Sequence, residues 1–158
     1  SWSAPFIMAA INTKNIHRSN LLLGHQYGED FRYDEMLLTG DGEQGKAAAD
    51  YVAKDDSIGK SDLQPGDGPT QEERENGNYD AIFAGQNCKG ELMISSVQGD
   101  RDPGYGSTSK MLAEAAICLL ENPTLAGGGL WTPAAALGQA LIDRLQAHAG
   151  LTFQIEKG

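Results

Sequence analysis

The stretch YDAIFAGQNCKGELMISSVQ, residues 79–98, contains two strand-like runs separated by a short polar segment. Tyr79–Gln86 and Glu91–Gln98 are rich in residues that favour extended structure. The segment between them ends in Gly90, as is typical of a short hairpin loop. The pattern predicts an antiparallel β-hairpin, and a hairpin favours an antiparallel sheet as the framework of the fold.

Two helices and a strand are predicted after this hairpin. A cap at Ser107 or Thr108 begins the first helix, and the Asn-Pro pair at residues 122–123 ends it. The Thr-Pro pair at residues 132–133 begins the second helix, in which leucine recurs at every fourth position. Residues 151–155 alternate between apolar and polar side chains and are predicted as a strand.

The region before the hairpin is predicted to contain two more helices and a strand. Ser3 and Pro5 have the types expected of an N-cap and an early helical proline, so we expect a helix from there to about residue 23. Phe31–Thr39 alternates imperfectly and is predicted as a strand. Lys46–Lys54 is predicted as a short helix.

Residues 55–78 carry many Asp, Gly, Pro and Ser residues and are predicted as loop, with one helical turn begun by the capping-box pair Thr70 and Glu73. The order of elements favours an α+β fold. We expect a mixed, largely antiparallel sheet of about four to five strands with helices packed on one face. The length of 158 residues fits a single domain over residues 1–158.

Composition argues against several classes of function. The net charge of −10 and the lack of any basic run argue against a nucleic-acid partner, because phosphate binding needs clustered Lys and Arg. The longest apolar run, residues 5–11, is too short for a membrane span of about 20 residues. Cys88 and Cys118 form no CxxC pair, and the three histidines lack metal-ligand spacing. Two reduced thiols are favoured over one disulfide, which predicts a cytoplasmic protein.

Residues 40–45, GDGEQG, match the dinucleotide-binding pattern GxGxxG. We favour a tight strand-to-helix turn instead. A Rossmann strand is buried on both faces and therefore apolar, whereas residues 32–38, RYDEMLL, are largely polar. Asp41 and Glu43 would also place negative charge where a pyrophosphate must approach.

The stretch GDRDPGYGSTSK, residues 99–110, is a glycine-rich loop that leads into a predicted helix. Free backbone N–H groups at a helix N-terminus can hold a carboxylate or a phosphate. Arg101 and Lys110 would add positive charge there, and Tyr105 could stack or hydrogen-bond. The alternative is a structural loop whose glycines adopt positive φ and whose acids neutralise the arginine. The residues themselves leave both interpretations open.

A second polar cluster lies on the first predicted helix and consists of Asn12, Arg18, Ser19 and Asn20. Arg18 lies one turn after Lys14, so both side chains could face an anionic ligand. A solvated helix face is the alternative interpretation of the same pattern.

Six short stretches of this chain occur in the order in which one known family has them. They are PFIMAAINT (5–13), RSN (18–20), FRYDE (31–35), PGDGP (65–69), GDRDPGYGST (99–108) and LWTPA (130–134). Together they resemble the C-terminal part of saccharopine dehydrogenase-like oxidoreductases. The resemblance spans nearly the whole chain and includes the bacterial branch of trans-acting enoyl reductase-type proteins.

The resemblance implies that an NAD(P)-binding Rossmann domain precedes this region in a longer polypeptide, and that this chain is its substrate and dimerisation domain. It implies a small-molecule substrate held between the two domains, a homodimer, no complete cofactor site in this chain, and no activity of this chain alone. It assigns no catalytic residue. It places these residues on the substrate side: Arg18, Ser19, Asn20, Asp102, Gly104, Tyr105, Ser107 and Thr108.

A non-catalytic module with the same fold is the alternative hypothesis. It would serve dimerisation or ligand binding, and it predicts a homodimer through an exposed sheet edge or helix face.

Overall fold

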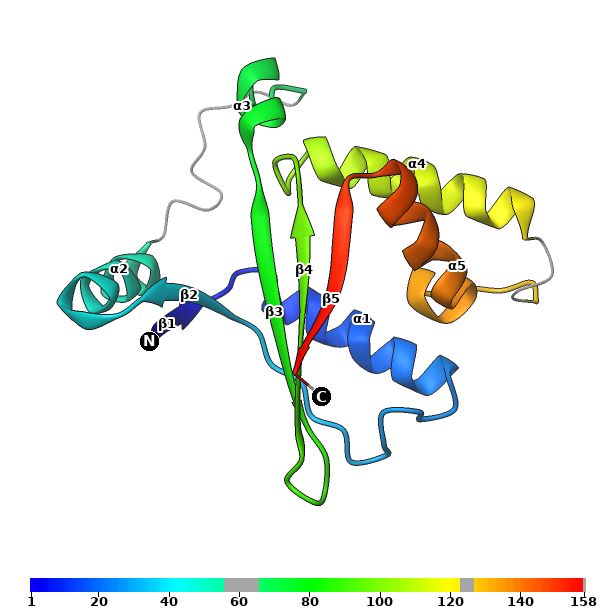
Figure 1. Ribbon diagram of the computed structural model, residues 1–158, viewed down its shortest axis with the longest axis horizontal. Coiled ribbons are helices and arrows are strands. Elements are labelled where there is room, and N and C mark those ends of the chain that lie inside the picture. Colours follow the sequence, from blue (N-terminus) through cyan, green and yellow to red (C-terminus); the bar gives the residue numbers. More distant parts are fainter. Residues whose placement is uncertain (56–65, 123–126, 158) are drawn as a thin grey trace. The chain divides into compact units, whose positions relative to one another are not determined.

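The computed structural model describes residues 1–55, 66–122 and 127–157. The chain divides into two compact units, Ser1–Pro65 and Gly66–Gly158, and each unit is described by itself. The helices are α1 (Ala9–Leu22), α2 (Gly42–Lys54), α3 (Gln71–Asn76), α4 (Gly106–Glu121) and α5 (Pro133–His148) (Figure 1). The strands are β1 (Trp2–Pro5), β2 (Met36–Gly40), β3 (Tyr79–Gln86), β4 (Leu92–Gly99) and β5 (Leu151–Lys157).

The α+β class is confirmed, but the strands lie in two antiparallel sheets. The first unit holds the pair β1–β2, and the second unit holds three strands in the order β3-β4-β5. The predicted framework hairpin is present, since β3 pairs with β4 along its whole length. All strand pairs among the described residues are antiparallel.

The predicted helix start at Ser3 is wrong. Residues 2–5 are extended as β1, in which Ala4 pairs with Leu37 and is almost fully buried. A proline disfavours helical backbone in the residue before it, so Pro5 keeps Ala4 extended. Helix α1 begins only at Ala9.

The predicted strand Phe31–Thr39 is only partly correct. Strand β2 begins at Met36, and residues 31–35 form an irregular segment beside α1. The rings of Phe31 and His17 lie 5.6 Å apart, edge to face, which joins this segment to the helix. Aromatic side chains occur both in strands and in loops that pack on a helix. The alternation of residues 31–39 therefore did not distinguish a strand from such a loop.

The turn between β2 and α2 is tight, and α2 begins at Gly42 rather than at Lys46. Gly40 and Gly42 both have positive φ, at 95° and 66°. A Cβ at Gly45 would overlap the carbonyl of Gly40, so the glycine lets helix and strand meet closely. Thr39 Oγ1 donates a hydrogen bond of 2.9 Å to the carbonyl of Gly45 and fixes the turn.

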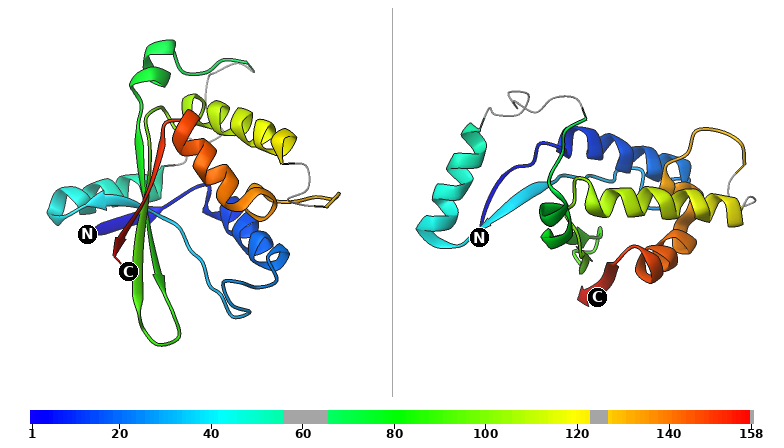
Figure 2. Two further views of the ribbon diagram at one scale, coloured as in Figure 1. Left: turned by 45° about the vertical axis from the view of Figure 1, so that its right-hand side comes forward. Right: turned by 90° about the horizontal axis from the view of Figure 1, so that it is seen from above.

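In the second unit, α4 and α5 pack on one face of the three-stranded sheet (Figure 2). Leu145, Ala149 and Leu151 form the buried cluster at this contact, together with partly buried Val97 and Phe153. A neighbouring cluster of Cys118, Ala136 and Leu137 joins the two helices to each other. The predicted capping box of Thr70 and Glu73 is present at the start of α3.

Helix α5 begins at Pro133 as predicted, but it is not continuous. Gly138 has φ 51° and ψ −130°, which interrupts the helix. Such backbone is accessible to glycine and strongly disfavoured for other residues.

An ion-pair group joins α5 to α4. Arg144, in the second half of α5, donates hydrogen bonds of 2.9 and 2.7 Å to Glu114 of α4 and also pairs with Glu121.

The remaining expectations concern thiols and the membrane. Cys88 is exposed, Cys118 is buried, and both are free. No helix in the described part of the chain is both long and apolar enough to cross a bilayer. Helix α4 ends at Glu121 with Asn122 as its C-cap, as the Asn-Pro pair predicted, although Pro123 itself lies outside the described residues. Residues 56–65 of the predicted loop also lie outside them.

Candidate functional site

The glycine-rich loop before α4 is organised by the carboxylate of Asp102. This carboxylate accepts hydrogen bonds from the backbone N–H groups of Gly104, Tyr105 and Gly106, at 2.9, 3.2 and 2.5 Å. The predicted cap at Ser107 or Thr108 is therefore wrong, because a carboxylate four residues before Gly106 satisfies the first donors of the helix. The backbone carbonyl of Asp102 in turn accepts the N–H of Ser107.

The hydrogen bond from Gly106 N–H is the main cause that lowers the pKa of Asp102 below its usual range, although partial desolvation opposes the shift. The positive charge of Arg74 contributes in the same direction. Asp102 is therefore ionised at neutral pH and acts as a built-in anion at the N-terminus of α4. The donors that we expected for a bound carboxylate or phosphate are occupied by the protein itself.

The glycines of this loop permit close approach and do not adopt positive φ. Gly99, Gly104 and Gly106 are absent from the positive-φ residues of the described chain. A Cβ at Gly106 would lie 2.8 Å from the carbonyl oxygen of Arg74 and 3.0 Å from the carboxylate of Asp102. The interpretation that these glycines serve positive φ is therefore wrong, while a structural role of the loop is supported.

The basic side chains of the loop have acidic partners. Lys110 Nζ lies 3.4 Å from a carboxylate oxygen of Asp100 and 3.4 Å from the backbone carbonyl of Ala149. Arg101 lies 3.8 Å from Glu75 of α3. Both cations therefore already have acidic partners, and the partner of Arg101 lies outside the loop. Neither supplies the unpaired positive charge that we expected beside a bound anion.

The other predicted residues of this loop differ in exposure. Ser107 is fully buried, and its hydroxyl lies 2.9 Å from the hydroxyl of Tyr79. Thr108 is exposed and donates a hydrogen bond of 2.6 Å to the carbonyl of Pro103. Tyr105 is 56% exposed as a residue, and its ring lies near enough to Gly68 that a Cβ there would touch it. Tyr105 and Thr108 thus present side chains that a ligand could reach.

In the first unit, Ser19 and Asn20 serve the local fold. Ser19 is buried and donates to the carbonyl of Asn15 at 2.9 Å. Asn20 is 3% exposed, donates from Nδ2 to the carbonyl of Gly28 at 2.8 Å, and accepts the N–H of Tyr27 at 2.9 Å. Asn20 thereby holds the loop after α1 against the helix. Arg18 lies on the exposed side of α1.

The first unit also contains a polar group that the sequence did not reveal. The carboxylate of Glu35 accepts hydrogen bonds from Tyr33 at 2.6 Å and from Asn12 at 2.9 Å. Burial, together with the hydrogen bond to Glu35, raises the pKa of Tyr33. Asn12, predicted to face a ligand, is instead engaged with Glu35. Residues 12 and 35 are separated by a whole loop, so no short motif linked them.

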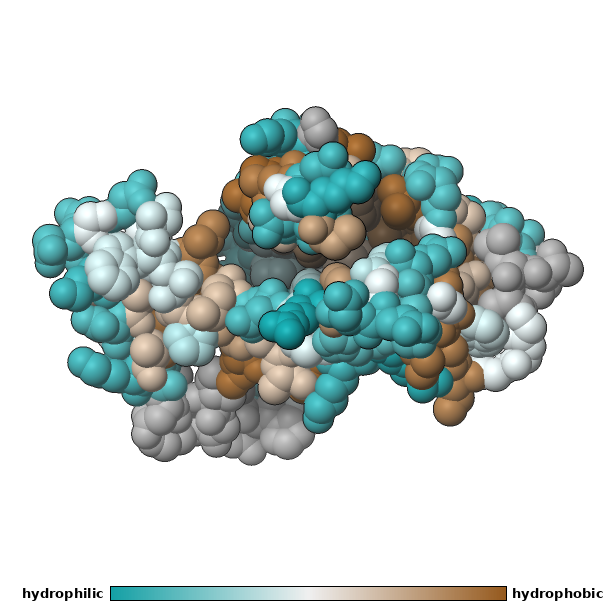
Figure 3. Space-filling view, turned by 90° about the horizontal axis from the view of Figure 1, so that it is seen from below, coloured by the Kyte–Doolittle hydropathy of each residue, from teal (hydrophilic) through white to brown (hydrophobic). Residues whose placement is uncertain are grey.

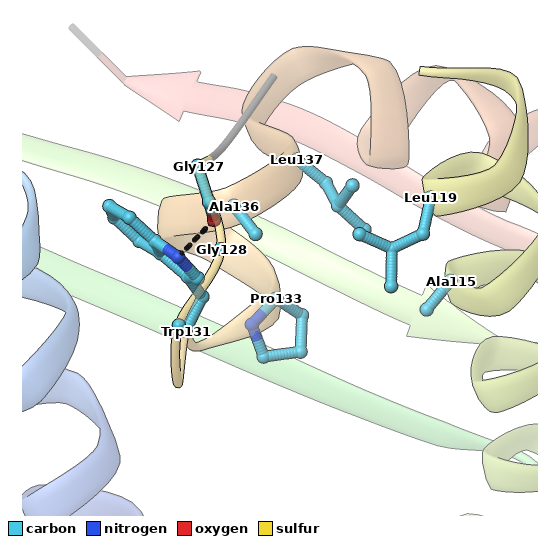
Figure 4. A pocket seen from close by; sticks show the side chains of 9 residues that line it. Ala115, Leu119, Gly127, Gly128, Trp131, Pro133, Ala136 and Leu137 are labelled. Atoms are coloured by element: carbon cyan, nitrogen blue, oxygen red, sulfur yellow. Dashed lines mark hydrogen bonds between the residues drawn. The ribbon is translucent and has the colours of Figure 1, made fainter. Parts of the chain in front are cut away.

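An apolar pocket of about 290 Å³ opens between α4, α5 and the residues before α5. Figure 4 shows the side chains of Leu119 and Leu137 directed toward each other across it, with Ala136 between Leu137 and Trp131 and Pro133 below them. Trp131 Nε1 donates a hydrogen bond of 2.8 Å to the carbonyl of Gly127, which closes the glycine segment into a loop beside the pocket. The pair of a glycine run and a tryptophan was the only sequence signal for this site.

The GxGxxG segment differs from a dinucleotide site in its surroundings. Strand β2 pairs antiparallel with β1, and its residues Met36, Leu37 and Leu38 are exposed. A Rossmann strand is instead buried within a parallel sheet. Asp41 also occupies the N-cap position of α2. These residues do not fit a pyrophosphate.

In the described part of the chain, no cluster of three or more His, Cys, Asp or Glu could hold a metal.

The chain is similar to proteins named trans-acting enoyl reductases. One of them, from Mycobacterium tuberculosis (strain ATCC 25618 / H37Rv), carries this name provisionally. It is 35% identical over 172 residues, which cover 97% of this chain and 41% of that protein. The trans-acting enoyl reductase of Mycobacterium ulcerans (strain Agy99) is 31% identical over 91% of this chain and 39% of its own length. That of Mycobacterium bovis (strain BCG / Pasteur 1173P2) is 30% identical over the same shares.

The chain thus spans about two fifths of the length of the curated relatives it matches. No family model matches it, and no solved structure matches it.

Proposed function

We propose that this chain is the substrate-side part of an NAD(P)-dependent enoyl reductase, related to the saccharopine dehydrogenase-like oxidoreductases. The observation that carries the proposal is the 35% identity over 97% of the chain to a protein named for enoyl reduction. The homologous region is only 41% of that relative. The remainder of such a polypeptide supplies the Rossmann domain that the sequence resemblance implies.

The reaction adds a hydride and a proton across the carbon–carbon double bond of an enoyl group, which becomes a saturated acyl group. A bound nicotinamide cofactor would supply the hydride. Because the residues of the GxGxxG segment do not fit a pyrophosphate, we assign the cofactor to the rest of the polypeptide. The role of this chain is to bind the acyl group, orient it and exclude water.

The apolar pocket is the part of this chain suited to that role. Its lining combines aliphatic side chains of α4 and α5 with the ring of Trp131. Its volume of about 290 Å³ lies near the lower limit for small-molecule sites, so it suits a segment of hydrocarbon chain. Each methylene group that is buried there would contribute about 0.8 kcal/mol to binding.

The substrate-side residues of the second unit divide by their accessibility. Tyr105 and Thr108 are exposed and can contact a substrate, whereas Asp102, Gly104 and Ser107 build the loop that positions them. In the first unit, exposed Arg18 is the residue suited to a negatively charged group, while Ser19 and Asn20 hold its helix and the following loop.

The test uses the longer polypeptide that contains this chain. Calorimetry with NADPH and with NADH should show saturable binding of at least one, and a crotonyl thioester should then be reduced with consumption of that cofactor. Failure of the longer polypeptide to bind either nucleotide would refute the proposal. Cofactor binding without reduction of any enoyl thioester would refute the enoyl assignment alone.

A further inference from the structure

Asn76 ends the short helix α3, and Gly77 follows it on the way to β3, so the two residues form an Asn-Gly pair. In such a pair the backbone nitrogen of the glycine can attack the side-chain amide carbon of the asparagine, because glycine has no Cβ to obstruct the approach. Ring closure forms a succinimide and releases ammonia, and water then opens the ring to aspartate or isoaspartate. No other asparagine of the chain is followed by glycine. Asn76 is therefore the most reactive asparagine of the unfolded chain.

The fold requires a glycine at position 77. A Cβ there would lie 2.6 Å from Cα and Cβ of Asp102, and rotation of a side chain cannot relieve an overlap with backbone. The backbone N–H of Asp102 also donates a hydrogen bond of 3.2 Å to the carbonyl of Arg74 in α3. A larger residue after Asn76 would slow the attack, but this close contact between α3 and the Asp102 loop excludes it.

The helix blocks the reaction in the folded chain. The backbone N–H of Gly77 donates a hydrogen bond of 3.1 Å to the carbonyl of Glu73 in the last turn of α3. The attack requires this nitrogen to lose its proton and to approach the side chain of Asn76. Because the nitrogen is held by Glu73 and Asn76 has helical backbone, the reaction requires the last turn of α3 to open.

Helix α3 is built so that it can open by itself. It has six residues, and none of them is buried. Its N-terminus depends on the capping box, in which the N–H of Glu73 donates to Thr70 Oγ1 at 3.2 Å and the N–H of Thr70 donates to the carboxylate of Glu73 at 2.8 Å. Short exposed helices have little stability of their own and open without unfolding of the core.

We propose that Asn76 is a site of spontaneous deamidation whose rate is set by local opening of α3. The reaction consumes one water, releases one ammonia and converts the side-chain amide to a carboxylic acid, so it needs no oxidant, cofactor or enzyme. The product places a negative charge at the C-terminus of α3, where the helix dipole is also negative. Isoaspartate in addition inserts a methylene carbon into the backbone beside Asp102. Both changes weaken the contact between α3 and the loop that carries Tyr105.

Asn87 provides an internal comparison for the effect of exposure. It is exposed in the turn between β3 and β4, and Figure 3 looks onto this turn as hydrophilic surface. The residue after it is Cys88, whose Cβ obstructs the backbone nitrogen. Asn87 should therefore react slowly in the folded and in the unfolded chain, although it is fully accessible to water.

Tandem mass spectrometry of the chain, incubated in mildly alkaline buffer with and without urea, tests the proposal. Trypsin cleaves after Arg74 and Lys89 and so places Asn76, Asn78 and Asn87 on one peptide. In urea, Asn76 should deamidate at least about tenfold faster than the other two, and folding should slow it at least about tenfold. Equal rates at Asn76 with and without urea would overturn the proposal. The same holds if Asn76 reacts no faster than Asn87 in urea.

Two variants distinguish local opening from global unfolding. Thr70→Ala removes the cap of α3 and should accelerate deamidation of Asn76 about fivefold. Val97→Ala reduces the packing of the sheet against α5, so it should lower global stability and leave the rate at Asn76 unchanged. Equal acceleration by both variants would show that global unfolding sets the rate, and an unchanged rate in Thr70→Ala would refute control by α3.

Hydrogen exchange of the deamidated chain tests the structural consequence. The amide of Asp102 donates to Arg74 of α3, so it should exchange faster after deamidation, while the amide of Phe153 in β5 should not change. Full protection of the Asp102 amide in the deamidated chain would contradict the weakened contact. None of these measurements involves a nicotinamide cofactor or an enoyl substrate, so their outcome is independent of the reaction proposed above.

Discussion

The hydroxyl groups of Tyr79 and Ser107 lie 2.9 Å apart, and this contact ties the first residue of β3 to the first turn of α4. Ser107 has no exposed surface, so its hydroxyl depends on Tyr79 for a partner. Gly99 makes the contact reachable, because a Cβ there would overlap the ring of Tyr79. Two of the sequence-predicted site residues, Ser107 and Thr108, are positioned by this junction.

Tyr79→Phe should lower the free energy of unfolding by about 1–3 kcal/mol, because it leaves the buried hydroxyl of Ser107 without a partner. Ser107→Ala removes the same hydrogen bond. Urea unfolding of both single variants and of the double variant would give the coupling between them. Losses that simply add in the double variant would show that the two hydroxyls do not interact.

Gly106→Ala should destabilise the chain by about 1–3 kcal/mol, because its Cβ would press on the carbonyl of Arg74 and on Asp102. Gly85→Ala in β3 is the matched control, since a Cβ there meets nothing within 4 Å. Equal losses of stability in the two variants, measured by thermal unfolding, would contradict the close-approach argument.

Asp102→Asn should change the acid dependence of stability. Since the pKa of Asp102 is lowered in the folded chain, its ionised form stabilises the fold above the unfolded-state pKa of about 3.9. That stabilisation is lost as pH falls through the lower folded-state pKa. The difference in melting temperature between wild type and Asp102→Asn should therefore be largest near neutral pH and shrink below about pH 4. A difference that does not vary with pH would show that ionisation of Asp102 is unimportant.

Asn20→Ala should cost about 2–3 kcal/mol, because it removes two nearly buried hydrogen bonds that hold the loop after α1. Asn15→Ala is the control on the same helix, where the side chain is exposed. Arg18→Ala should raise the KM of the longer polypeptide for its substrate, because Arg18 is the exposed cation that we propose to meet a negatively charged group. An unchanged KM would remove Arg18 from the substrate side.

The apolar pocket can be followed through its own tryptophan. In a Trp2→Phe background, Trp131 is the only tryptophan, so its emission should change saturably when a medium-chain acyl N-acetylcysteamine thioester is added. Leu119→Arg, which places a charge in the pocket, should weaken the effect at least about tenfold. A response of the same size in Leu119→Arg would place the ligand elsewhere.

Local patterns predicted the second unit well. The hairpin strand Tyr79–Gln86 was predicted to the residue, and the capping box at Thr70 and the Thr132–Pro133 helix start were also correct. Each of these depends on residues that are neighbours in the chain. Periodicity, a cap or a tight turn is sufficient information in such cases.

The errors occurred where a distant segment decided the structure. Ser3 and Pro5 fit a helix start locally, but pairing with β2 makes them a strand. Ser107 has the right type for a cap, yet the carboxylate of Asp102 reaches the helix first and Tyr79 takes the serine hydroxyl. The apolar pocket combines two helices and a glycine segment, and no single stretch of sequence indicates it.

The interruption of α5 at Gly138 lies between residues that line the pocket and residues that pack on the sheet. The turn before Gly138 carries Ala136 and Leu137, which belong to the pocket wall, while Leu145 beyond it is anchored to the sheet. A straight helix would transmit any shift at one end to the other as a rigid rod. The change of direction at Gly138 instead lets the first turn follow the pocket wall while the rest of α5 follows the sheet.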